Sequence, residues 1–317
     1  MPSGLEHSGG SLDRWIIEQR PAKNPVDPRR AYAALVEKEH GPDGAIEDVA
    51  TIFLTNRECP FRCLMCDLWK NTSDATVPVG AIPEQIRRAL AALPPARTLK
   101  LYNSGNFFDP HAIAPTDYAE IAELAAPFRT VIVESHPRMI GRRCLEFREL
   151  VRGRLHVAMG LETVHPDVLP RLNKQMTLAD FERAAGELRR NGMAVRAFIL
   201  LRPPYMTEEE GVLWARRSID FAFNAGVECC AVIPTRAGNG AMEALASRGE
   251  FHPPTLDSLE NVLEYGLSLQ GGRVFVDLWD IEKISGASPN GAARVERLAR
   301  MNLSQRLEPP VDRSVVA

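Results

Sequence analysis

Six apolar runs alternate with amphipathic segments through the middle of the chain. The runs are rich in Val, Ile, Leu and Ala and lack a strict polar alternation, as strands covered on both faces do. They are expected at 48–55, 97–105, 129–136, 154–163, 193–204 and 227–236. Helices are expected between them at 83–93, 115–128, 141–153, 177–192 and 207–226. Strands and helices that alternate at this spacing predict parallel βα units.

Local signals fix the starts of two of these helices. Thr177, with Asp180 three residues later, has the spacing of a capping box, and Gly192 marks the end of that helix. Thr207 is the expected N-cap of the next helix, whose first turn is acidic. Six βα units are compatible with an open doubly wound sheet or with a partial barrel. In both architectures the ligand site lies at the carboxyl ends of the strands.

The two ends of the chain are less regular. Residues 1–45 predict an arm with one short helix over "RRAYAALVEK" (29–38), and residues 46–240 predict the βα core. Residues 241–317 predict an extension that closes the barrel, with a helix near 256–270 and a strand over "GRVFVDLWD" (272–280). The tail from Ser285 is weakly patterned.

Composition narrows the function classes. The 317 residues are 45% hydrophobic and 25% charged, with a formal net charge of −3. This balance gives no electrostatic attraction to nucleic acid or to an anionic membrane. No run approaches eighteen apolar residues, and the first residues lack the charged and apolar regions of a secretory signal. With clustered cysteines, which fit a reducing compartment, this predicts a cytoplasmic protein without a membrane partner.

Three of the six cysteines, Cys59, Cys63 and Cys66, lie in the stretch "TNRECPFRCLMCDLWKNT" directly after the first expected strand. Their C-x3-C-x2-C spacing suits three corners of an iron–sulfur cubane and leaves the fourth iron open. A zinc site with a fourth ligand elsewhere is the alternative. Zinc loops usually pair cysteines as C-x2-C and repeat the pair, whereas Cys144 stands alone here and Cys229 and Cys230 are adjacent.

The chain resembles the radical S-adenosylmethionine (SAM) superfamily over residues 45–305. Within it, the resemblance is to the branch that holds the elongator catalytic subunit and the radical-SAM subunit of archaeosine synthase. It rests on the cysteine stretch and on these later blocks: "LYNSGNFFD", "VESHPRMI", "GLETVHPDVLPRLNKQMTLADF", "FILLRPPYMTEEE" and "HPPTLDSLENVL". The late cysteines common in this branch are replaced here by "GASPNGAARVERL".

This resemblance implies an α/β fold, a partial (β/α)6 TIM-type barrel of parallel strands. It implies a [4Fe-4S] cluster on Cys59, Cys63 and Cys66, with SAM on the open iron. Reductive cleavage of SAM would then give a 5′-deoxyadenosyl radical that abstracts hydrogen from a substrate. An external electron donor of the flavodoxin or ferredoxin type is implied as a partner.

Matching motifs assign further cofactor-binding residues. The turn "NSGN" takes the place of the superfamily's glycine-rich turn, so Gly105 lets the backbone approach SAM while Ser104 or Asn106 accepts from its amino group. Such a turn also forms without a ligand. Met65 stands where an aromatic residue often packs near the adenine.

Two charged residues match positions that bind SAM in the family. Glu162 corresponds to a residue that binds the ribose hydroxyls, with a surface ion pair as the alternative. Lys174 corresponds to a basic residue that meets the SAM carboxylate, with a solvated lysine as the alternative.

Candidates for substrate contact lie at the ends of later strands. Cys229 and Cys230 should face opposite sides of their strand, and one of them is a candidate hydrogen donor or ligand of a second cluster. A small buried hydrophobe is the alternative for both. His136 could equally cap its strand through hydrogen bonds. The other candidates are Arg138, Arg202 and Tyr205.

Four functions follow from this sequence. The first is a radical SAM enzyme that acts on a small biosynthetic intermediate, which the net charge favours. The second is a tRNA-base-modifying enzyme, which the branch favours although the basic clusters are short and scattered. The third transfers a methyl or aminocarboxypropyl group from SAM. The fourth is a non-catalytic, zinc-stabilised barrel.

Overall fold

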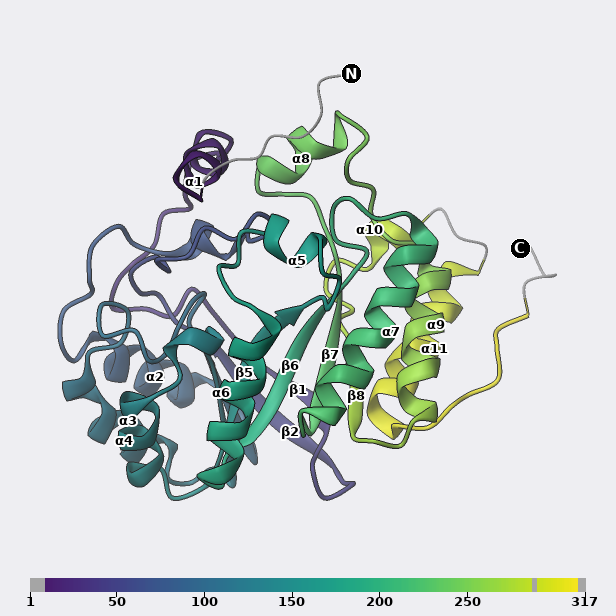
Figure 1. Ribbon diagram of the computed structural model, residues 1–317. Coiled ribbons are helices and arrows are strands. Elements are labelled where there is room, and N and C mark those ends of the chain that lie inside the picture. The colour runs from purple at the N-terminus through teal and green to yellow at the C-terminus, as the bar shows by residue number, and fades with distance from the viewer. Residues whose placement is uncertain (1–8, 287–289, 313–317) are drawn as a thin grey trace.

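The computed structural model describes residues 9–286 and 290–312, and all its strands form one curled sheet (Figure 1). The strands follow one another around this sheet in chain order. The first pairs antiparallel with the second, and all later neighbours are parallel. The strands are β1 (Ala33–His40), β2 (Ile46–Phe53), β3 (Thr98–Tyr102), β4 (Thr130–Glu134), β5 (Arg154–Glu162), β6 (Ala194–Leu201), β7 (Cys229–Pro234) and β8 (Arg273–Val276).

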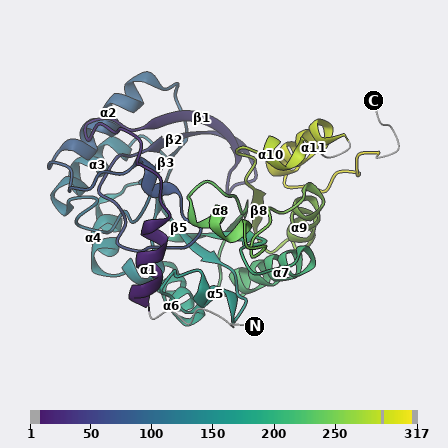
Figure 2. The same ribbon diagram turned by 90° about the horizontal axis from the view of Figure 1, so that it is seen from above.

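Helices follow the parallel strands and surround the convex face of the sheet, as the view from above shows (Figure 2). The predicted partial barrel is therefore confirmed, with β2 to β7 as its six strands. The α-helices are α1 (Gly9–Glu18), α2 (Ala81–Ala92), α3 (Tyr118–Ala125), α4 (Arg142–Leu150), α5 (Val168–Arg171), α6 (Leu178–Arg190), α7 (Glu208–Asn224), α8 (Ala241–Ala246), α9 (Leu256–Ser268), α10 (Glu282–Ser285) and α11 (Gly291–Ser304). Short 3-10 helices are η1 (Leu68–Asn71), η2 (Pro115–Asp117) and η3 (Pro137–Met139).

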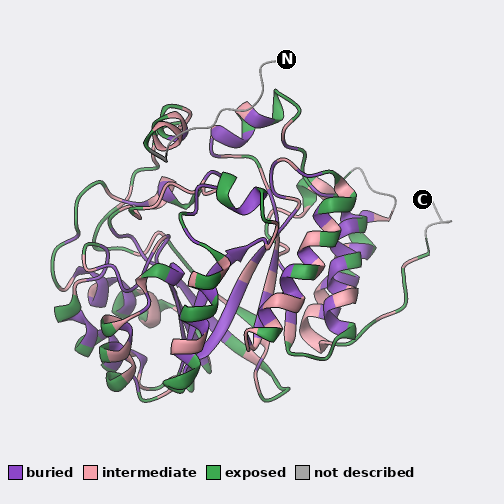
Figure 3. Cartoon of the chain, viewed as in Figure 1, coloured by how far each residue is buried: buried purple, intermediate pink, exposed green. Residues whose placement is uncertain are grey.

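The main hydrophobic core lies between the sheet and these helices, where buried residues concentrate (Figure 3). Alternate residues of each strand face this core: Ile52 of β2, Leu101 of β3 and Ile199 of β6 are fully buried in it. The residues between them face the interior of the barrel, because successive side chains of a strand point to opposite faces. The outer face of the sheet is therefore apolar, whereas its inner face also carries charged side chains such as Lys100 and Arg196.

The predicted helix caps are present. The Thr177 hydroxyl accepts from the backbone N–H of Asp180, whose carboxylate accepts from the Thr177 N–H. Thr207 and Glu210 form the same reciprocal pair at the start of α7. Each box satisfies backbone donors that the first helical turn leaves free. These signals are local in sequence, so the sequence placed both helix starts correctly.

The predicted helix over 29–38 is wrong, because residues 33–40 form strand β1. All eight of these residues pair with β2, from Ala33 opposite Phe53 to His40 opposite Ile46. Glu37 and Glu39 alternate along β1, and both pair with Lys100 of β3. Long-range pairing has overridden a local helix preference here.

Glu39 is the centre of an ion-pair network inside the barrel, near the amino ends of the parallel strands. Its carboxylate accepts from Lys100 Nζ of β3 at 2.6 Å and from both terminal nitrogens of Arg196 of β6. Arg273 of β8 approaches it at 3.9 Å. Burial alone would raise the pKa of Glu39, but Arg196 and Lys100 hold it well below its usual range. The network joins β1 through side chains to β3, β6 and β8, three strands that are not its neighbours in the sheet.

The arm and the tail contain two helices that the sequence did not indicate. Helix α1 lies in the arm, and α11 lies in the stretch described as weakly patterned and contacts both edge strands, β1 and β8. Residues 1–8, 287–289 and 313–317 of these predicted segments lie outside the described residues. The boundaries at 45 and 240 stay predictions. None of the helices described here is both long and apolar enough to cross a bilayer.

Candidate functional site

The loop after β2 carries Cys59, Cys63 and Cys66 at the carboxyl end of the sheet. Burial raises the pKa of Cys59 to about 11 and those of Cys63 and Cys66 to about 12. Each thiol also raises the pKa of another in the set, so the three lie close together. Buried neighbouring thiols become thiolates when a metal centre supplies positive charge.

Polar side chains from distant segments fix the backbone of this cysteine loop. Asn239 Nδ2 donates to the carbonyls of Leu64 at 2.8 Å and Cys66 at 3.1 Å. Trp69 Nε1 donates to the same Cys66 carbonyl at 3.0 Å. Asn173 Nδ2 donates to the Arg62 carbonyl at 2.7 Å. These bonds satisfy carbonyls that no sheet or helix pairs, so the loop is held without regular secondary structure.

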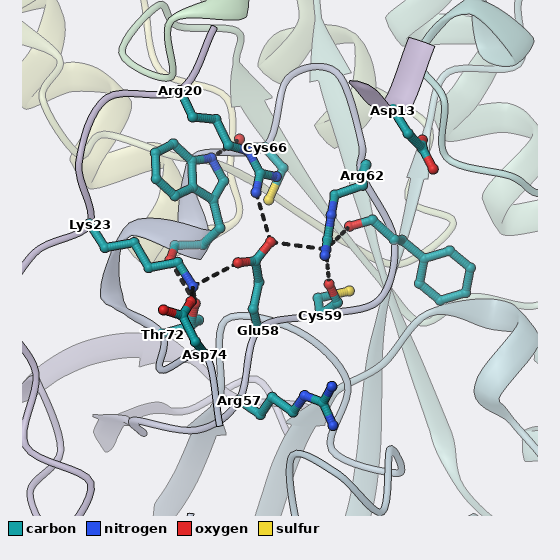
Figure 4. Close-up of polar contacts among 12 residues, drawn as sticks. Asp13, Arg20, Lys23, Arg57, Glu58, Cys59, Arg62, Cys66, Thr72 and Asp74 are labelled. Carbon is teal, nitrogen blue, oxygen red and sulfur yellow. Dashed lines mark hydrogen bonds and ion pairs between the residues drawn. The ribbon is translucent and has the colours of Figure 1, made fainter. Parts of the chain in front are cut away.

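Glu58 links the cysteine loop to the N-terminal arm, as Figure 4 shows. Its carboxylate pairs with Arg20 at 2.7 Å, with Lys23 at 2.7 Å and with Arg62 at 2.9 Å. Burial opposes its ionisation, but hydrogen bonds from Lys23 and Arg20 lower the pKa of Glu58. Arg62 also donates to the Cys59 carbonyl. One carboxylate next to the first cysteine thus ties the arm to the loop.

A small apolar cluster covers the same loop. Ile16 of α1 and Leu64 of the cysteine loop are buried together with Met242 and Leu245 of α8. Both helices lie above the barrel mouth (Figure 1). The arm and α8 therefore shield one side of the loop from water. The position of these two segments over the cysteine loop could not be predicted from the sequence.

The "NSGN" turn after β3 packs directly against the first cysteine. A Cβ on Gly105 would lie 3.2 Å from Cys59 Cβ, so only glycine fits this contact without movement. Asn106 Nδ2 donates to Cys59 Sγ at 3.2 Å, and its Oδ1 accepts from the His136 N–H at 2.5 Å. Ser104 adopts φ 53° and its hydroxyl lies 3.0 Å from that of Tyr32.

Glu134, at the end of β4, supports this turn and was missed by sequence reasoning. Its carboxylate accepts from the backbone N–H of Asn103 at 2.6 Å and of Gly105 at 3.3 Å. Burial raises the pKa of Glu134 to about 7, against the lowering effect of these backbone donors. The sequence feature that could have identified Glu134 is its position as a carboxylate at the end of the apolar strand β4.

Glu162 and Lys174 form a buried ion pair beside the cysteines. Lys174 Nζ lies 2.6 Å from Glu162 Oε1, and both side chains are less than a tenth exposed. Burial alone would lower the pKa of Lys174, but Glu162 and the Cys63 thiol raise it above its usual value. The alternatives of a surface ion pair and of a solvated lysine are therefore wrong.

The backbone at the end of β5 makes room for this pair. Glu162 has φ 64°, and the pairing register with β6 shifts between Gly160 and Glu162. A Cβ on Gly160 would overlap both the Glu162 carboxylate and the Lys174 ammonium group. Glu162 thus has a strained left-handed backbone conformation, two residues after a position where only glycine fits. Backbone strain of this kind concentrates at functional sites.

His136 lies in the same group of residues but is fully hydrogen-bonded. Its ring stacks on Phe61 of the cysteine loop at 3.8 Å. Nδ1 accepts from the Arg138 N–H at 3.2 Å, so Nε2 is the nitrogen that donates to the Lys174 carbonyl, at 2.8 Å. Burial lowers the pKa of His136 to about 3. This neutral ring joins three loops, which favours the strand-capping alternative over substrate contact.

The remaining candidates have partners other than the thiols. Arg138 is exposed and donates to the Gln175 carbonyl at 3.0 Å, while Arg202 pairs with Glu208 and donates to the Pro253 carbonyl at 2.7 Å. Tyr205 packs under Arg171 and, with Met65, against a buried cluster of Val168, Leu172, Leu200 and Met206. Their roles toward SAM or substrate stay predictions.

The prediction that Cys229 and Cys230 face opposite sides of β7 is confirmed. Cys230 belongs to the outer core, and Cys229 faces the barrel interior, where it is in register with Arg196 of β6. Both are fully buried. Their proposed roles as hydrogen donor or cluster ligand stay predictions.

The donor set fits the [4Fe-4S] cluster that the family resemblance implies. Three partly exposed thiols on one loop are near enough to interact electrostatically, and Asn106 provides a hydrogen bond to one sulfur, which is one way a protein tunes such a cluster. Among residues 9–286 and 290–312, no three His, Cys, Asp or Glu side chains gather closely enough to hold a single metal ion. Thiols that bind different irons of a cube do not need to meet at one point.

Comparisons with known proteins agree with this arrangement. Residues 53–213 match the model of the Radical SAM superfamily. Archaeosine synthase subunit beta of Thermococcus kodakarensis is 28% identical over 211 residues, which cover 63% of this chain and 65% of that protein. This chain thus spans slightly less than two thirds of that relative's length. Archaeosine synthase subunit beta of Methanosarcina acetivorans is 27% identical over 273 residues, 80% of this chain and 77% of that protein.

A solved structure supports the fold. Methylornithine synthase (PylB) matches with a TM-score of 0.51 and 14% sequence identity, over 92% of this chain and 76% of that chain. At this identity the likeness concerns the barrel architecture.

Proposed function

Because the chain belongs to the radical SAM superfamily, an enzyme family that uses a [4Fe-4S] cluster and SAM, we propose that it generates a substrate radical at the cysteine loop. When bound, these groups supply one-electron cleavage of the SAM sulfonium to methionine and a 5′-deoxyadenosyl radical, which takes a hydrogen atom from the substrate. The observation that carries the proposal is the position of three partly exposed thiols next to the buried Glu162–Lys174 pair.

The chain's own residues would hold and orient these groups. Cys59, Cys63 and Cys66 hold the cluster. Glu162 accepts hydrogen bonds from the ribose hydroxyls while Lys174 faces the SAM carboxylate. In the structure Lys174 Nζ donates to Glu162 Oε1 at 2.6 Å, so the two side chains lie side by side at the proposed SAM site.

The turn and the arm supply positioning and protection. Gly105 allows close approach of the backbone to the cluster, and Glu134 holds the N–H groups of this turn in place. Helices α1 and α8 keep water from one side of the loop. An external donor of the flavodoxin or ferredoxin type would deliver the electron.

The substrate that we propose is a small biosynthetic intermediate. A net charge of −3 gives no general attraction to a polyanion. A tRNA base is the second candidate, which the archaeosine synthase relatives favour. Electrophoretic mobility shifts with tRNA at increasing salt separate the two. Salt-sensitive binding at micromolar protein would overturn the preference for a small substrate.

The reaction type is tested by product analysis. Anaerobically reconstituted protein is incubated with SAM and a reductant, and the products are identified by mass spectrometry. We expect 5′-deoxyadenosine and methionine. S-adenosylhomocysteine or methylthioadenosine as the main product would show transfer of a methyl or aminocarboxypropyl group instead.

A further inference from the structure

Three aromatic rings on the inner face of the barrel belong to no buried core cluster. Phe53, Tyr102 and Phe198 lie on β2, β3 and β6, and each is half-buried. Their strand neighbours Leu101 and Ile199 are fully buried in the outer core. Large rings that face inward and yet remain open to solvent are available to a ligand.

These rings contact one another across the barrel. Phe53 meets Tyr102 at 6.1 Å, and Tyr102 meets Phe198 at 6.2 Å, both edge to face. Strands β3 and β6 are separated in the sheet by β4 and β5, so the second contact spans the interior. Phe53, Tyr102 and Phe198 therefore form a continuous row of rings, the aromatic wall.

The residues in register with Phe198 are small. Gly160 of β5 and Ala231 of β7 pair with it directly. Glu162 follows two residues after Gly160, at the site proposed for SAM. The Glu162–Lys174 pair covers Gly160, so the strand position in register with Phe198 lies directly beside the end of β5 proposed for SAM.

Buried polar groups lie on the same inner face, below the wall. Arg196 and His156 are almost fully buried, and Arg196 Nε and His156 Nε2 have no hydrogen-bond partner among the described residues. Burial lowers the pKa of His156 to about 3, so its ring is neutral. Unpaired buried polar atoms are costly, and a ligand with ring heteroatoms would satisfy them.

We propose that the aromatic wall binds the planar aromatic or heteroaromatic ring of a small substrate. Offset or edge-to-face contacts with Phe53, Tyr102 and Phe198 would orient the ring below SAM, and its polar edge would face Arg196 and His156. The proposal deepens the radical SAM function and rests on it. It makes Phe198 a specificity-determining residue, because its ring crosses the interior.

The test uses anaerobic, SAM-loaded holoenzyme and saturation-transfer NMR with three probes: tryptophan, guanosine and the aliphatic analogue cyclohexylalanine. We expect at least one of the two ring probes to bind, and cyclohexylalanine to bind more weakly. Phe198→Leu keeps an apolar side chain but removes the ring, so it should weaken binding of the ring probe about tenfold, as the loss of one stacking partner does. Phe198→Tyr should retain it.

Phe128→Leu, the same change in a phenylalanine packed against the outer core, is the matched control and should bind like wild type. Phe53→Leu gives a second variant if Phe198→Leu does not fold. Failure of both ring probes to bind at millimolar concentration refutes the proposal, as does equal binding of cyclohexylalanine or unchanged binding by both wall variants.

The same samples separate this inference from the proposed function. Wild-type protein that releases 5′-deoxyadenosine but binds neither ring probe refutes the aromatic wall alone. Wild-type protein that releases no 5′-deoxyadenosine refutes the proposed function, whatever it binds.

Discussion

Two glutamates, Glu39 and Glu58, are each approached by three cationic side chains, but they do different work. Glu39 lies inside the barrel and meets Lys100, Arg196 and Arg273. Lys100 and Arg196 are only 6% and 4% exposed, so these charges have no access to water as an alternative partner. The Glu39 network joins strands that are distant in the sheet.

Glu58 lies at the barrel mouth, and its partners are more exposed, up to 24% for Arg62. Through Arg20 and Lys23 it joins the beginning of the N-terminal arm to the loop that carries the cysteines, and neither of these two segments is part of the sheet. A carboxylate with three cationic neighbours therefore has different expected effects in the two places. Burial makes the Glu39 network important for stability, and location makes the Glu58 network important for the cluster.

The largest expected effect is on stability, from Glu39→Gln. The substitution leaves Arg196 buried without its counter-charge and leaves Lys100 with the half-exposed Glu37, 2.9 Å away. Breaking a buried pair in this way costs about 3–5 kcal/mol. Urea denaturation of the anaerobic protein measures the loss. Glu37→Gln is the control, because Glu37 is 48% exposed and should cost less than about 1 kcal/mol. Equal losses in the two variants would contradict the distinction.

Glu58→Gln should affect the cluster more than the stability of the fold. We expect a stability loss of only about 1 kcal/mol, because its partners can be partly solvated. The arm should release the cysteine loop, so that the iron–sulfur absorption bleaches several-fold faster in air. Asp74→Asn is the control, since Asp74 pairs with Lys23 at the exposed edge of the network and should not change bleaching. A bleaching rate like that of wild type would refute the role of Glu58.

Gly160→Ala tests the ion pair that neither glutamate network contains. The added methyl group would displace Glu162 and Lys174, so SAM affinity should fall about tenfold, equivalent to about 1.4 kcal/mol. Equilibrium dialysis with SAM measures it. Gly186→Ala is the control, because its methyl group would meet the flexible end of the Arg190 side chain, 3.2 Å away, which can move aside. Unchanged SAM affinity in Gly160→Ala would exclude Glu162 and Lys174 from the site.

The last prediction concerns the pH dependence that Glu134 gives to stability. Its pKa is raised by burial from 4.5 to about 7, so the folded protein holds this proton more tightly than the unfolded chain. The stability it contributes is fully present below pH 4.5 and is lost as the pH rises through about 7. Glu134→Gln should remove this slope from urea midpoints measured across that range on the protein without cluster. A slope identical to that of wild type would show that Glu134 does not titrate there.

The sequence predicted those parts of the fold that local patterns determine. The strands β2 to β8 and the capped helices α6 and α7 follow from apolar runs and capping residues. Strand β1 could not be predicted, because Glu37 and Glu39 find their partners on strands far along the chain. Helix α11 was missed because its buried face includes Arg294 and Arg297, paired with Glu260 of α9, so its apolar periodicity is weak.

The candidate site shows the same limit. Cys59, Cys63 and Cys66 were recognisable because their spacing is local, and the positions of Glu162 and Lys174 came from motif order. Glu58 and Glu134 were missed because their importance comes from Arg20, Lys23 and the "NSGN" turn, which only the folded chain brings to them. Contacts between distant segments, rather than residue types, define these roles.

The central claim is that the three cysteines hold a [4Fe-4S] cluster with an iron open to SAM. Electron paramagnetic resonance of the reconstituted, reduced protein with and without SAM tests it most directly. We expect a [4Fe-4S] signal that changes when SAM is added and that is absent from Cys66→Ser. A wild-type protein that takes up zinc and gives no iron–sulfur signal, or a signal that SAM does not alter, would contradict it.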